Sequence, residues 1–95
     1  MDIGAFRQTF AAAAPPAGFS QAMQALWWDA HGDWDRAHKC AMQQDDADGC
    51  AVHAYLHRKE GDLSNAGGWY KRAGREMASG TLEQEWQALV ETLPG

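Results

Sequence analysis

The sequence contains few of the residues that build β-sheets. Valine and isoleucine together occur only three times in 95 residues, and no stretch of six residues alternates between apolar and polar side chains. Because strands are rich in β-branched residues and repeat with a period of two, a sheet is not expected. Alanine, glutamine, leucine and methionine, which favour helices, are plentiful instead. The composition therefore predicts an all-α protein.

Long apolar runs and an excess of positive charge are also missing. No run approaches the roughly 18 apolar residues of a membrane-spanning helix, and the first residues lack the basic start and apolar stretch of a signal peptide. Thirteen acidic residues outnumber eight basic ones, which gives a net charge of −5. Nucleic-acid binding needs clustered positive charge. We therefore expect a cytoplasmic protein with neither a membrane nor a nucleic acid as partner.

Cysteines are scarce, and the sequence has no Cys-x-x-Cys or His-Glu-x-x-His motif. Two isolated cysteines, Cys40 and Cys50, in a chain expected in the cytoplasm are interpreted as reduced, buried thiols. No motif for a cofactor is present, and none is expected.

Apolar spacing and turn signals divide residues 1–95 into about six short helices within one domain. The expected units are an N-terminal capping helix over 1–14, a helical hairpin over 20–44, a second hairpin over 48–78 and a C-terminal capping helix over 81–93. The clearest amphipathic stripe lies on the second helix of the second hairpin. Its members are Leu63, Ala66, Tyr70, Ala73 and Met77.

Two Gly-Asp turns, at Gly32 and Gly61, indicate an internal repeat with an offset of 29 residues. Each turn is expected to end one helix and to cap the next, because glycine stops a helix and aspartate begins one. Each also has an alanine seven residues before its glycine and another five residues after it. These alanines are Ala25, Ala37, Ala54 and Ala66.

This pattern resembles the tetratricopeptide repeat over roughly residues 21–73. Trp28 matches the aromatic position of that family's first helix, and Tyr70 matches the aromatic position of its second. The resemblance implies two stacked antiparallel hairpins with a capping helix at both ends. By analogy it implies a scaffold that binds a protein or peptide in the groove of its hairpins, or that self-associates. Residues 53–66 are also similar to a segment of small bacterial proteins with no known activity.

The offset of 29 residues is shorter than the family's period of about 34, and the first helix of the second hairpin departs most from the family. Cys50, His53 and His57 occupy positions where the family has large or apolar residues. With Glu60 they form one stripe, at spacings of three, four and three. A helical wheel turns this stripe outward, opposite the helix's apolar residues. The alignment instead turns Cys50, His53 and His57 toward the hairpin's other helix, and the residues alone leave both alternatives open.

The stripe supports three interpretations. Two histidines four residues apart can chelate a divalent metal ion, with Glu60 as a ligand or an orienting partner; His31 and His38 would join them only if the fold brought them near. Alternatively, His57 and Glu60 form a general acid–base pair. The simplest interpretation is hydrogen bonding between helices. His53, His57 and Glu60 are thus the candidate catalytic residues, and His53 and His57 the candidate metal ligands.

Candidate partner-binding residues are aromatic or basic. In each of the pairs Trp27-Trp28 and Trp69-Tyr70, one ring must point away from its helix's main apolar stripe, which makes Trp28 and Trp69 candidates for an exposed surface. The favoured hypothesis is a small protein–protein interaction scaffold or self-associating module. The alternative is a small enzyme or metal-binding protein that uses the histidine stripe. The residues expected to bind a partner are Trp28, Trp69, Arg58, Tyr70 and Arg72.

Overall fold

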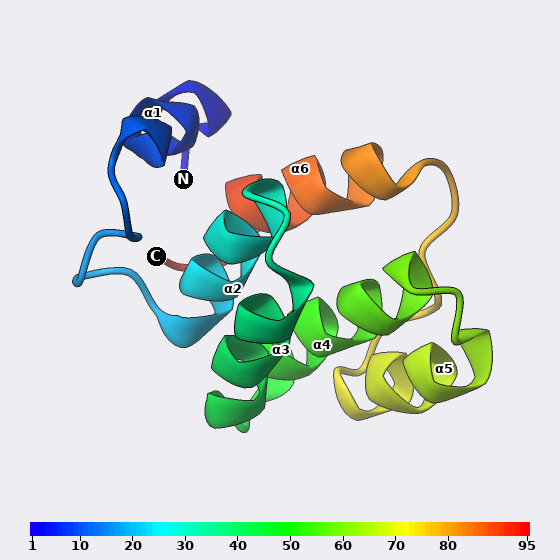
Figure 1. Cartoon of the computed structure of the whole chain (residues 1–95). Helices are drawn as coiled ribbons and strands as arrows, with labels where there is room; N and C mark the ends of the chain where they lie inside the picture. The colour runs from blue at the N-terminus through cyan, green and yellow to red at the C-terminus, as the bar shows by residue number, and fades with distance from the viewer.

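The computed structural model describes residues 1–95 as an arrangement of helices without strands (Figure 1). The all-α prediction is confirmed. No helix combines the length and apolar character needed to cross a membrane. The elements are α1 (Ile3–Gln8), the short 3₁₀ helix η1 (Thr9–Ala11), α2 (Gln21–Ala30), α3 (Trp34–Gln43), α4 (Ala47–Lys59), α5 (Leu63–Arg72) and α6 (Leu82–Thr92).

Capping side chains determine where the helices begin. Asp33 and Asp62 accept hydrogen bonds from the backbone N–H groups three residues later, at the starts of α3 and α5. Gly32 and Gly61, just before them, have φ angles of +78° and +88°. Other residues are strained there, which explains why glycine ends the preceding helices. Thr81 begins α6 with the expected capping box.

The two Gly-Asp turns create two antiparallel hairpins, α2–α3 and α4–α5, which stack through α3 and α4 (Figure 1). The predicted stacking is confirmed, whereas the tetratricopeptide resemblance stays a prediction. Helix α4 is central and contacts α2, α3, α5 and α6. Small residues permit this close packing. The four alanines of the repeat are fully buried: Ala25, Ala37, Ala54 and Ala66.

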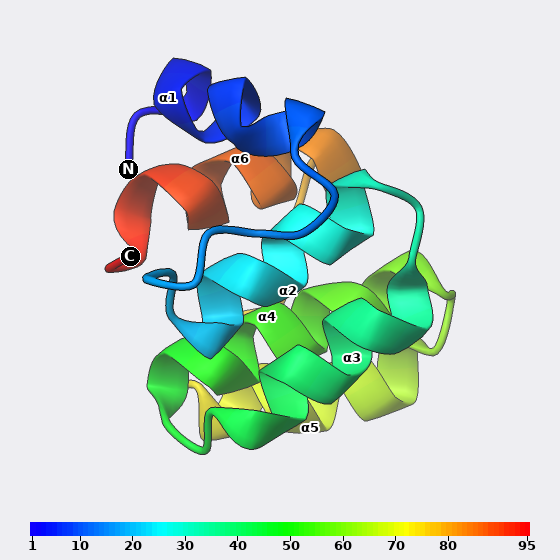
Figure 2. The same ribbon diagram turned by 60° about the vertical axis from the view of Figure 1, so that its left-hand side comes forward.

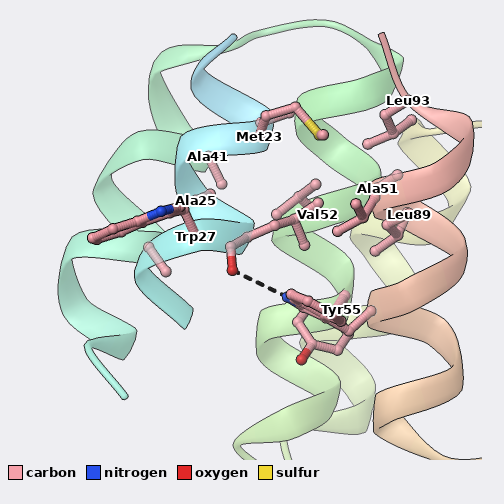
Figure 3. Close-up of a cluster of buried hydrophobic side chains, with 14 of the residues drawn as sticks. Met23, Ala25, Trp27, Ala41, Ala51, Val52, Tyr55, Leu89 and Leu93 are labelled. Atoms are coloured by element: carbon pink, nitrogen blue, oxygen red, sulfur yellow. Dashed lines mark hydrogen bonds between the residues drawn. The ribbon is translucent and has the colours of Figure 1, made fainter. Parts of the chain in front are cut away.

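The terminal helices cover the hairpins from the side formed by α2 and α4 (Figure 2). Helix α6 lies on α2 and α4, and α1 lies on α6. In Figure 3, Met23, Val52 and Leu89 project from α2, α4 and α6 into one core. The indole N–H of Trp86 adds a hydrogen bond of 3.0 Å to the Leu26 carbonyl. Because α6 packs on both α2 and α4, it interrupts any continuous peptide groove along these two helices.

Helix α5 is shorter than expected. It ends at Arg72 instead of reaching residue 78, and Gly74 follows with a φ of +71°. Met77 therefore lies outside the helix and is 44% exposed, while Leu63 at its first turn is 55% exposed. The fully buried members of the predicted stripe are Ala66 and Tyr70.

Two other boundaries differ from the expected ones. Helical structure at the N-terminus ends with η1 at Ala11, four residues before Pro15, because a proline ring in a continuing helix would clash with the carbonyl of the residue four positions earlier. Helix α4 begins at Ala47, one residue earlier than predicted, with Asp46 as its cap. A Cβ atom on Gly49 would lie 1.7 Å from the backbone carbonyl oxygen of Gln44. Only glycine therefore fits at this close approach.

Candidate metal centre

The two histidines of the α4 stripe are buried, whereas Glu60 at its end is exposed. His53 and His57 are only 5% and 7% exposed, because α3 and α5 pack on either side of them. The Trp69 ring of α5 stacks on His53 with 3.8 Å between ring centroids, and Trp34 of α3 meets His57 edge-on at 5.8 Å. The outward orientation predicted by the helical wheel is therefore wrong. The stripe faces α5, as the repeat alignment predicts, and α3 as well.

A third histidine completes the cluster. His38 of α3 places its Nε2 atom 2.9 Å from Nε2 of His53, and its ring centroid is 5.2 Å from that of His57. One nitrogen atom from each ring lies within 4.8 Å of the other two. The packing of α3 on α4 thus brings His38 to the stripe. His31 lies elsewhere, where its ring contacts the backbone carbonyl oxygens of Phe10 and Trp27.

Glu60 orients one ring of the cluster. Its Oε1 atom lies 2.5 Å from Nδ1 of His57, across the last turn of α4. A carboxylate that accepts a hydrogen bond from Nδ1 leaves the lone pair of the imidazole on Nε2. Carboxylates orient metal-ligating histidines in the same way.

The environment keeps two of the three rings neutral. Burial, with smaller contributions from the nearby His38, His57 and Arg72, lowers the pKa of His53 from its ordinary 6.5 to about 4. Burial also lowers the pKa of His38, and neighbouring His57 adds to this effect. Both rings are therefore uncharged at pH 7, which is the form that binds metal ions.

Such a set of groups suits a borderline-soft divalent ion. Three imidazole nitrogens are a recurrent ligand set of Zn²⁺, and imidazole also suits Cu²⁺ and Ni²⁺. Three protein ligands leave one position of a tetrahedral ion for water. The same rings also make structural hydrogen bonds, one between α3 and α4 from His38 to His53 and one at the end of α4 from His57 to Glu60.

Arg58 and Tyr70 do not join the histidines. Both bind the buried carboxylate of Glu85 on α6: the Arg58 Nη1 group donates to Oε1 at 3.0 Å, and the Tyr70 hydroxyl donates to Oε2 at 2.5 Å. Burial, together with Glu85, raises the pKa of Tyr70. These side chains link both helices of the second hairpin to α6, and they add no acid–base group to the His57–Glu60 pair.

The two candidate surface tryptophans are half-buried and lie apart. The Arg36 guanidinium lies over Trp28, 4.5 Å from the ring centroid. Trp69 packs against His53 on α4, and the Arg72 guanidinium lies 4.8 Å from its centroid. The chain therefore has no single exposed aromatic surface made of these two residues. Instead, Trp69 forms one wall of the histidine cluster.

One buried polar network has no counterpart in the sequence analysis. Asp29 is 4% exposed, and its two oxygens accept hydrogen bonds from the Tyr55 hydroxyl at 2.6 Å and the Lys59 ammonium at 2.8 Å. These partners are 26 and 30 residues away along the chain. The available signal was an aspartate on the otherwise apolar face of α2.

Comparisons with protein families, curated protein sequences and solved structures gave no match.

Proposed function

We propose that this protein binds one divalent metal ion, such as Zn²⁺, through His38, His53 and His57. Glu60 orients His57 for this role. The observation that carries the proposal is the convergence of three imidazole nitrogens, contributed by two helices, within 4.8 Å of one another.

The spacing of the His38 and His53 nitrogens is close to that of two ligands on one ion, and the His57 nitrogen lies within 4.8 Å of both. Bonds of about 2.0–2.1 Å to a tetrahedral zinc place neighbouring nitrogens about 3.3 Å apart. His38 and His53 lie at 2.9 Å, held by one N–H···N hydrogen bond. A metal ion can replace that hydrogen bond when both rings carry their proton on Nδ1, because each Nε2 atom then has a lone pair that can bind the ion. Because both rings are neutral at pH 7, binding does not require a charged ring to lose its proton first.

A purely structural role accounts for less of the arrangement. One His–His hydrogen bond is enough to join α3 to α4. That hydrogen bond does not require a third imidazole, His57, beside the other two. It also does not require the Glu60 carboxylate at Nδ1 of His57. Burial of the neutral His38 and His53 rings also costs stability in acid, because folding lowers their pKa values.

The proposal is tested by titrating Co²⁺ into untagged, metal-free protein and recording its visible absorption bands. A Zn²⁺ titration in a calorimeter gives the stoichiometry. We expect one ion per chain, with binding strongly weakened in His38→Gln and His53→Gln. His31→Gln is the matched control, since this fourth histidine lies outside the cluster and its loss should leave binding intact. Folded protein that gives neither cobalt bands nor zinc binding heat would reject the proposal.

We propose self-association as a second function, supported by two exposed apolar side chains, Leu63 at the start of α5 and Met77 beyond its end. Leu63 is 55% and Met77 44% exposed, and they flank Gly67. The methyl carbon of Met77 lies 3.7 Å from the position that a Cβ on Gly67 would occupy, and Leu63 lies one turn before Gly67. A second copy of the chain packing there would bury both side chains. Sedimentation velocity should show concentration-dependent dimers, absent in Leu63→Lys; a wild-type chain monomeric at every concentration argues against it.

A further inference from the structure

A hollow of about 400 Å³ lies on the side of α4 facing away from the histidine cluster. Its size is within the range of small-molecule sites, about 300–1,000 Å³. Residues from α1, η1, α2, α4 and α6 line it, so five separate parts of the fold meet there. Charged and aromatic side chains make up much of the lining, among them Arg7, Phe10, Asp29, Lys59 and Trp86.

The buried carboxylate in the lining of the hollow already has hydrogen-bond partners within the chain. Both oxygens of the buried Asp29 carboxylate accept hydrogen bonds, one from Tyr55 and one from Lys59. Asp29 is therefore not a free acceptor for a ligand's cation. It holds the Lys59 ammonium at the edge of the hollow.

The rim carries hydrogen-bond donors that the chain does not use. Lys59 has three N–H donors, spends one on Asp29, and has a side chain 40% exposed. The Arg7 guanidinium is half-exposed, and its nearest carboxylate, on Glu83, is 3.6 Å away, beyond hydrogen-bond range. Since the Glu83 side chain is 77% exposed, it neutralises Arg7 only weakly. The unused hydrogen-bond donors facing this hollow are thus the two cations Arg7 and Lys59, and Glu83 at the rim is the one acidic group there that is largely exposed to solvent.

The walls of the hollow are aromatic and aliphatic. The rings of Phe10 and Trp86 stand 6.5 Å apart between centroids, at 53° to each other, and Ala30 and Leu82 complete the apolar lining. Planar rings pack well in such tilted aromatic surroundings.

We propose that this hollow binds a small aromatic carboxylate, with its ring against Phe10 and Trp86 and its carboxylate on Arg7 and Lys59. Charge-assisted hydrogen bonds from two cations favour an anion over a neutral compound of the same shape. The site shares no residue with the histidine cluster, so it stands independently of metal binding.

The test is an NMR titration of the ¹⁵N-labelled chain with benzoate as the probe and benzamide as its neutral counterpart. We expect saturable shifts at the Trp86 indole and at Phe10, with benzoate binding about tenfold or more tightly than benzamide. Arg7→Gln should remove most of that preference, because Arg7 is on the rim and its replacement leaves the core intact. Arg75→Gln changes an exposed arginine outside the hollow and should leave the preference for benzoate over benzamide unchanged.

Any of several results of this titration overturns the proposal. They are no saturable shifts with benzoate, shifts confined to residues outside the hollow, or equal binding of benzoate and benzamide to the wild-type chain. Loss of the preference in Arg75→Gln as well as in Arg7→Gln also overturns it, since the effect would then follow overall charge.

Discussion

The Nε2 atoms of His38 and His53 lie 2.9 Å apart and join the first hairpin to the second. One of these nitrogens donates a hydrogen bond to the other, and burial lowers the pKa of both rings. His57 lies beside them, and Glu60 contacts the Nδ1 atom of His57. The contact between the hairpins therefore brings together three imidazole rings and one carboxylate, groups that bind metal ions in many proteins.

Replacing Glu60 with glutamine should weaken metal binding without disturbing the fold. The amide no longer accepts the His57 N–H as a charged group, and losing such an orienting carboxylate typically costs about 10–100-fold in metal affinity. Competition with a chromophoric chelator measures the change. Glu76→Gln, at an exposed glutamate away from the cluster, is the control and should bind as the wild type does. Equal affinity in all three proteins would exclude Glu60 from the site.

Acid should destabilise the metal-free protein through the cluster. The pKa of His53 is lowered from 6.5 to about 4 on folding, so between these values the unfolded chain binds more protons than the folded chain. The contribution of His53 to the free energy of unfolding then decreases as the pH falls from about 6.5 to 4 and is constant below pH 4. Urea unfolding measured across pH 4–8 in the presence of a chelator tests this. His53→Gln should flatten the profile, and an unchanged slope in this variant contradicts the assignment.

Glu85 should matter more to stability than its neighbour Glu83. Glu85 is buried and accepts hydrogen bonds from Arg58 and Tyr70, whereas the Glu83 side chain is 77% exposed. Glu85→Gln removes the charge that both donors bind, and we expect a loss of about 1–3 kcal/mol. Glu83→Gln should change stability by less than about 0.5 kcal/mol. If urea unfolding shows comparable losses of stability in Glu85→Gln and Glu83→Gln, the buried network around Glu85 does not contribute strongly to stability.

Two glycine substitutions in helices should have opposite effects. Gly49→Ala places a Cβ 1.7 Å from the Gln44 carbonyl oxygen, which forces the start of α4 to move and costs about 1–3 kcal/mol or more. Gly68→Ala in α5 meets no atom within 4 Å and should stabilise by about 0.5–1 kcal/mol, because alanine favours a helix. Thermal unfolding of both variants gives the comparison. A tolerated alanine at position 49 would contradict the described approach of Gln44 to α4.

Local signals allowed much of the fold to be predicted. Gly32 and Asp33, repeated as Gly61 and Asp62, marked the hairpin turns because glycine conformation and aspartate capping act over a few residues. The capping box at Thr81 located the start of α6 for the same reason.

Features that depend on tertiary packing could not be predicted. The histidine cluster needs His38, fifteen residues before His53, and no local pattern shows which face of α3 turns toward α4. The placement of α6 over α2 and α4 depends equally on long-range packing, as does the pairing of Asp29 with Tyr55. The periodicity of α4 misled the helical-wheel prediction, because this central helix is covered on both its apolar and its polar side.

X-ray absorption spectroscopy at the zinc edge of untagged, zinc-loaded protein tests the metal centre most directly. The account predicts one ion per chain, with three imidazole nitrogens at about 2.0–2.1 Å and the outer-shell scattering of imidazole rings. It also predicts loss of that scattering in His38→Gln. A wild-type ion surrounded only by oxygen atoms, without imidazole scattering, would contradict it.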